Sequence, residues 1–173
     1  PRKQAHSEFP FLLQNPQTDL EKAMAKIEQA LAKERDFWHV KSYQYNRAIL
    51  EVPEKQVIEE IKARWQLPEV YLTFLERFSP ASDAFLKGIN LYGANTLIKH
   101  QCGYAFSSTD DEHFHDWKAH WLVIADKDAD PYILDLSKSD GNDAPIYKAP
   151  HGAGEWKWRK VARSFLEFLE KLS

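Results

Sequence analysis

The chain has 173 residues, 43% hydrophobic and 28% charged, and its six tryptophans and ten phenylalanines can bury too much apolar surface for a disordered chain. Its net charge of −3, from 26 acidic and 23 basic residues, speaks against a direct nucleic-acid partner. No apolar run approaches the roughly 18 residues of a membrane span. The single cysteine, Cys102, excludes an internal disulfide framework and fits a reducing compartment. We therefore expect a cytoplasmic protein that contacts no membrane.

The first half of the sequence predicts helices. Thr18 and Glu21 form a capping-box pattern, in which the hydroxyl and the carboxylate each accept a backbone N–H. Apolar residues then recur at helical spacing: Leu20, Ala23, Met24, Ile27, Ala30 and Leu31. Pro53 predicts a second helix, because the missing N–H of proline costs nothing in a first turn. Pro68 predicts a third helix, which continues to Phe78.

The second half predicts strands and one helix. Short apolar runs bounded by turn residues occupy 88–93, 121–125, 132–136 and 145–148. Strands this close in sequence must pair antiparallel, since parallel crossovers need a dozen or more residues. A final helix carries one apolar face, made of Val161, Phe165, Phe168, Leu169 and Leu172. The order predicts an α+β fold: a central, mostly antiparallel sheet flanked by two helical elements from the N-terminal half and a C-terminal helix.

The stretch from Asp126 to Leu136 spaces three carboxylates as a calcium loop does. Asp126, Asp128 and Asp130 match the first, third and fifth ligand positions of an EF-hand. The sixth position is Pro131, which cannot adopt the positive φ of the required glycine, and the twelfth is Ser137, which cannot chelate. We therefore interpret the acidic stretch as a surface hairpin turn between two apolar strands.

Two other clusters carry residues capable of chemistry. His113 and His115 would share one face of a strand and could bind zinc, but they match no zinc signature and a third ligand is missing. Cys102 could act as a nucleophile if His120 or His151 supplied the base. A lone cysteine is more often a small buried hydrophobe. The residues alone therefore define no catalytic set and no metal or cofactor site.

The indoles near the C-terminus allow two interpretations. Trp156 and Trp158 alternate with Lys157 and Arg159, a pattern that could stack on nucleobases. Packing of the indoles against the sheet or the last helix explains the same pattern without a ligand. We favour packing.

The order of these motifs resembles the SUKH superfamily. The resemblance is carried by LPEVYLTFL at 67–75, by WLVIAD at 121–126 with DPYILDL at 130–136, and by VARSFLEFL at 161–169. Ile146 and Tyr147, followed by His151 and Gly152, resemble the third strand and its turn. The similarity spans about residues 53–172, so we predict one domain over 1–173 in which 1–52 form a helical extension outside the motifs. The hairpin turn is rich in Asp here, where many members carry Gly.

The resemblance implies a non-catalytic binding module. Many bacterial members are immunity proteins that bind and neutralise a cognate polymorphic toxin, often a nuclease, and others are signalling scaffolds. We therefore expect a protein toxin as partner, no cofactor, and a monomer or homodimer. If the toxin is a basic nuclease, carboxylates that mimic phosphates would speed its association. The candidate partner-binding residues are Asp110, Asp111, Glu112, Asp126, Asp128 and Asp130. A hydrolase that uses Cys102 or His113 and His115 is the enzymatic alternative.

Overall fold

The computed structural model describes residues 15–39, 50–110 and 112–173. Three helices come first: α2 (Asp19–His39), α3 (Lys55–Arg64) and α4 (Glu69–Arg77). The rest of the chain forms a sheet with short helices between and after its strands: β1 (Asp83–Leu86), β2 (Ile89–Tyr92), α5 (Leu97–His100), β3 (Trp121–Lys127), β4 (Asp130–Asp135), η2 (Leu136–Lys138), β5 (Ile146–Lys148), β6 (Arg159–Ala162) and α6 (Phe165–Leu172). None of the helices in these ranges combines the length and the hydrophobicity of a membrane-spanning segment.

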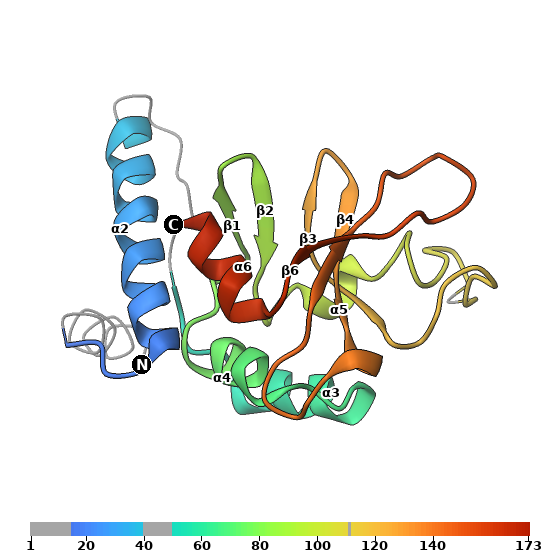
Figure 1. Cartoon of the computed structure of the whole chain (residues 1–173), viewed down its shortest axis with the longest axis horizontal. Helices are drawn as coiled ribbons and strands as arrows, with labels where there is room; N and C mark the ends of the chain where they lie inside the picture. The colour runs from blue at the N-terminus through green and yellow to red at the C-terminus, as the bar shows by residue number, and fades with distance from the viewer. Residues whose placement is uncertain (1–14, 40–49, 111) are drawn as a thin grey trace.

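The six strands form one sheet in the order of the sequence, and every neighbouring pair is antiparallel. Figure 1 shows α2 and α6 beside the β1 end of the sheet, whereas the long loops that follow α5 and β5 extend away from the other end. Helices thus surround an antiparallel sheet, and the predicted α+β fold is confirmed.

The core explains why the middle parts of the two central strands, β3 and β4, are continuously apolar. Residues 122–125 of β3 are all fully buried, so both faces of the sheet are covered at this point. On one side α6 contributes Phe165, which packs edge-on against Tyr71 of α4 with ring centroids 4.8 Å apart. The apolar stripe of α2, from Leu20 to Leu31, belongs to the same hydrophobic cluster.

The predicted helix starts are correct to within a few residues. The Thr18 hydroxyl accepts the N–H of Glu21 (3.1 Å), as in a capping box, whereas the Glu21 carboxylate accepts the N–H of Gln17 (2.9 Å), one residue before the N-cap. The start of the last helix was predicted too early. Val161 lies in β6. The Ser164 side chain accepts the N–H of Glu167 and caps α6, which therefore begins only at Phe165.

The first strand of the sheet was not predicted. β1 pairs with β2 through a two-residue turn at Lys87 and Gly88, both with positive φ (52° and 78°). This conformation matches the right-handed twist of a hairpin. The hairpin that joins β3 to β4 is built in the same way, with φ of 50° at Asp128 and 70° at Ala129. The acidic stretch is therefore a hairpin turn, as the sequence predicted.

Candidate functional site

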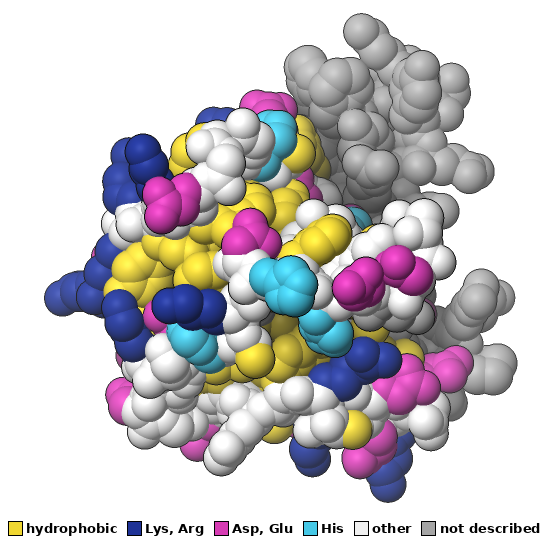
Figure 2. All heavy atoms as spheres, turned by 90° about the vertical axis from the view of Figure 1, so that its right-hand side faces the viewer, with side chains coloured by type: hydrophobic (Ala, Val, Ile, Leu, Met, Phe, Trp, Pro, Cys, Tyr) yellow, Lys and Arg dark blue, Asp and Glu magenta, His cyan; other side chains and the backbone are white. Residues whose placement is uncertain are grey.

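Five aromatic side chains meet at the end of the molecule opposite α2. Tyr104 follows α5, Trp117 lies in the loop before β3, Trp121 is the first residue of β3, and Trp156 and Trp158 come from the loop before β6. Adjacent ring centroids in this aromatic cluster lie between 5.1 and 6.3 Å apart. All five side chains remain partly exposed. Figure 2 shows apolar side chains gathered over this face.

Trp117 is the centre of the aromatic cluster. Its ring stands edge-on to Trp121 and Trp156, both at 5.4 Å, and to Trp158 at 5.8 Å. Edge-to-face pairs of this kind contribute about 0.5–1.5 kcal/mol each beyond the area they bury. The Trp117 indole N–H also donates to the carbonyl of Trp121 (3.1 Å), which fixes the ring plane. The cluster is therefore a preformed surface that does not need to order itself on binding.

A groove of about 890 Å³ lies beside the aromatic cluster and shares Trp117 and Trp121 with it. The end of α3 forms one wall and the segment from α5 to Phe106 forms another. Its other lining residues include Arg64, Trp65, Lys99, Cys102, Phe106 and His113. A hollow of this size is within the range of ligand sites in proteins.

The floor of the groove is held by a buried glutamine. The Gln101 amide donates to the carbonyls of Leu97 (2.9 Å) and Val123 (2.8 Å), and its oxygen accepts the N–H of Val123 (3.0 Å). β2 pairs with β3 only at Ala125 and Asp126 and does not reach Val123. The Gln101 side chain therefore makes the hydrogen bonds to the Val123 backbone that a neighbouring strand would otherwise make. This bonding fixes α5, and hence Lys99 and Cys102, against the sheet.

Basic side chains border this region. Arg64 and Lys99 are exposed and line the groove, whereas no Asp or Glu lines it among the residues that the structure describes. The Lys118 ammonium lies 5.6 Å from the centroid of the Trp121 ring, a cation–π contact that leaves the charge at the surface. The groove therefore presents positive charge next to apolar walls.

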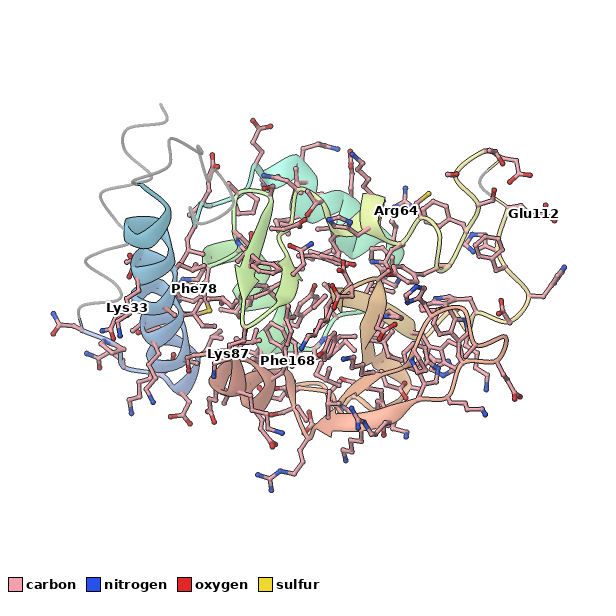
Figure 3. All side chains as sticks on the ribbon, turned by 90° about the horizontal axis from the view of Figure 1, so that it is seen from above. Lys33, Arg64, Phe78, Lys87, Glu112 and Phe168 are labelled. Carbon is pink, nitrogen blue, oxygen red and sulfur yellow. The ribbon has the colours of Figure 1, made fainter. Side chains whose placement is uncertain are left out.

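The acidic candidates divide into two groups. Asp110 and Glu112 are exposed in the loop before β3, where Asp110 accepts the N–H of Glu112 (3.2 Å). Asp111 lies outside the described residues. Figure 3 places Glu112 in the far part of that loop, beyond Arg64 at the end of α3. The other three carboxylates belong to the β3–β4 hairpin.

Of the three hairpin carboxylates, only that of Asp128 is exposed and makes no described bond to another element. Asp128 lies in the turn itself. Asp126 accepts the hydroxyl of Tyr92 (2.5 Å), and Asp130 accepts both the backbone N–H and the Nδ1 of His151 (2.9 and 2.6 Å). These bonds lower the pKa of the Asp130 carboxyl. The Tyr104 hydroxyl donates to the carbonyl of Ala129 (2.6 Å), so the turn adjoins the aromatic cluster.

Tyr104 is the titratable member of the aromatic cluster. Burial, and then the negative charges of Asp126 and Asp130, raise the pKa of its hydroxyl to about 12, while a hydrogen bond with Tyr92 opposes them. The hydroxyl therefore stays protonated at neutral pH and donates to the hairpin.

No hydrogen bond among the described residues joins Cys102 to either of its candidate bases, His120 and His151. Cys102 shares the groove with His113. The expected bases lie near other partners, because His120 is 4.0 Å from a carboxylate oxygen of Asp135 and His151 is bonded to Asp130. Within the described ranges, no group of three or more His, Cys, Asp or Glu side chains is placed to hold a metal ion.

The model of the SMI1/KNR4 family (SUKH-1) matches residues 53–171. The chain belongs to this family. The match begins just before α3 and ends within α6, so it includes the whole sheet, the groove and the aromatic cluster, whereas α2 lies outside it. No curated protein matches the chain.

Proposed function

We propose that this SUKH-1 domain is an immunity protein, which binds a protein toxin in the cytoplasm and neutralises it by covering the toxin's active site. The observation that carries the proposal is the aromatic cluster, five partly exposed rings locked together on one face. Binding energy at protein interfaces concentrates in Trp, Tyr and Arg side chains. A rigid surface also loses little side-chain entropy when it binds. Membership of the SUKH-1 family supports the same function.

The exposed carboxylates around this face would guide a basic toxin. Asp110 and Glu112 in the loop and Asp128 in the hairpin turn are exposed, whereas Asp126 and Asp130 are bonded to Tyr92 and His151. Charges at the rim of an interface act mainly on the association rate and its salt dependence. In this proposal Asp110, Glu112 and Asp128 steer the toxin, and the aromatic cluster holds it.

Trp156→Ala tests the proposal. The partner for the test is a toxin sought among the genes beside the one for this chain, and the measurements are rescue of growth on co-expression and the Kd from calorimetry. We expect the unsubstituted protein to rescue growth, and Trp156→Ala to weaken the complex by about 2 kcal/mol, or about thirtyfold in Kd. The control is Phe85→Ala: Phe85 is 46% exposed on β1, at the opposite edge of the sheet from the loop that carries Trp156.

Two results would contradict the proposal. A toxin that remains active and unbound in the presence of the unsubstituted protein would refute the immunity function. An equal loss of affinity in Trp156→Ala and Phe85→Ala would show that the aromatic cluster is not the interface.

A further inference from the structure

The groove continues around the end of α3. Two smaller hollows, of about 520 and 360 Å³, share Arg64 and Trp65 with the groove. One of them continues past His120 to the segment that follows β4, and the other follows the end of α3 to Leu72 of α4. Together they make an extended surface around Trp65, which reaches from Phe106 past the end of α3 to Leu136 and Leu72.

The charge along this extended surface has one sign. Lys62, Arg64 and Lys99 line its three parts, and no Asp or Glu lines any of them in the described part of the chain. The whole sequence carries a net charge of −3, so this composition differs from that of the protein as a whole. Arg64 and Lys99 are exposed, and neither has a described carboxylate within ion-pair distance. These two cations are available to an incoming carboxylate.

The walls between these charges are apolar. Ile98, Ala105 and Phe106 face the groove beside Trp117 and Trp121, and all of them are partly exposed. An apolar side chain placed here would lose its contact with water, which stabilises the complex by roughly 25 cal/mol per Å² of buried area. A partner that fits the groove therefore combines negative charge with at least one apolar anchor.

A polypeptide fits this surface better than a nucleic acid does. Stacking of bases needs free indole faces, but Trp117 is enclosed by three other indoles and Lys118 lies over Trp121. Asp110 and Glu112 are exposed in the loop next to the groove and would repel a phosphate backbone. A short segment with few carboxylates meets less of this repulsion than a polyanion does.

We propose that the groove binds an acidic segment of the partner protein, with an apolar side chain between Phe106 and Trp121 and its carboxylates on Arg64 and Lys99. This inference rests on the proposed function and names the part of the toxin that is recognised. The rest of the toxin would contact the aromatic cluster, which adjoins the groove through Trp117 and Trp121.

Cys102 allows a direct test, because it lines the groove and is the single cysteine of the chain. The rate at which a maleimide labels its thiol reports whether the groove is filled. The first probe is the toxin. The second probe is a set of short peptides with one Leu or Trp among Asp and Glu residues. The same peptides with Lys in place of Asp and Glu, and a single-stranded oligonucleotide, serve as comparisons. The test variant is Arg64→Gln with Lys99→Gln, and the control is Lys26→Gln with Lys33→Gln on α2, which removes the same charge at the opposite end of the molecule.

We expect the toxin and the acidic peptides to slow labelling of Cys102, and the lysine peptides and the oligonucleotide to leave it unchanged. Loss of both groove cations should weaken binding at least about tenfold, whereas the control variant should bind normally. Thermal melting of both variants confirms that they fold.

The outcomes separate this inference from the proposed function. If the toxin is neutralised while Cys102 stays fully reactive and both double variants bind alike, the groove inference is overturned and the immunity function stands. If the toxin does not bind, the immunity function fails and the peptides decide the groove inference. The inference would be overturned if acidic peptides left Cys102 reactive, or if the oligonucleotide protected Cys102 equally well. It would also be overturned if protection of Cys102 grew with the concentration of this protein alone.

Discussion

Replacement of Gln101 by Met should destabilise the protein and loosen the groove. Gln101 is 2% exposed and makes three hydrogen bonds, two of them to the backbone of Val123, which is fully buried. Methionine keeps the length of the side chain but offers no partner to these groups. The substitution therefore leaves one N–H and one C=O of β3 without a partner inside the core.

The magnitude follows from these two groups. A buried polar group that loses its partner costs about 1–3 kcal/mol, so the pair costs about 4 kcal/mol. The more apolar methionine recovers about 1 kcal/mol through burial. We expect the free energy of unfolding to fall by about 3 kcal/mol.

Urea unfolding followed by tryptophan fluorescence measures this loss, and hydrogen exchange at the Val123 amide should accelerate in the same variant. Gln56→Met is the matched control, because Gln56 is exposed on α3 and its amide reaches only Glu60, at 3.5 Å. A loss below about 1 kcal/mol in Gln101→Met, or an equal loss in Gln56→Met, would show that the glutamine does not replace a neighbouring strand.

Three further predictions concern the rest of the core. Gly93→Ala should prevent folding, as circular dichroism would show, because the new Cβ would lie 2.1 Å from the carbonyl oxygen of Pro80; a folded variant would contradict this. Tyr71→Phe should raise the free energy of unfolding by about 1 kcal/mol in urea titrations, since its fully buried hydroxyl has no described partner; a clear loss would reveal one. Burial opposes ionisation of Asp83, but hydrogen bonds from His100 and Thr96 outweigh it and lower the carboxyl pKa. Asp83 therefore stabilises the fold above its unfolded pKa of about 3.9, and its advantage over Asp83→Asn should disappear as the pH falls through its lower native pKa. Unfolding free energies at neutral and acidic pH measure this advantage, and a constant difference would refute it.

Local patterns predicted the elements that local interactions determine. The capping box at Thr18 and the apolar runs of β3 and β4 contain the information for their own structure, and the structure agrees with them. Val161 was placed in the last helix because its spacing fits a helical stripe, but pairing of β6 with β5 overrides that spacing. β1 has only four residues, too few for a pattern, and the Lys87-Gly88 turn was the one available signal.

The candidate site could not be predicted in the same way. Tyr104 and Trp117 lie 13 residues apart in the α5–β3 loop and Trp158 lies in the β5–β6 loop, and only the packing of these two loops brings their rings together. The groove depends on the end of α3 meeting the segment after α5, so Arg64 and Lys99 gave no signal. The six tryptophans are a clue to an aromatic surface, but the alternation of Trp156 and Trp158 with charged residues is equally typical of packing, and Trp117 stands in no motif.

We propose that the aromatic cluster and the adjoining groove together form the surface that binds the partner protein. Hydrogen–deuterium exchange of the chain, measured with and without the toxin, would locate this surface. We predict that binding slows exchange in residues 101–110, 112–121 and 151–158 and leaves α2 unchanged. Slower exchange confined to α2 and α6, with no change in these three segments, would contradict the claim.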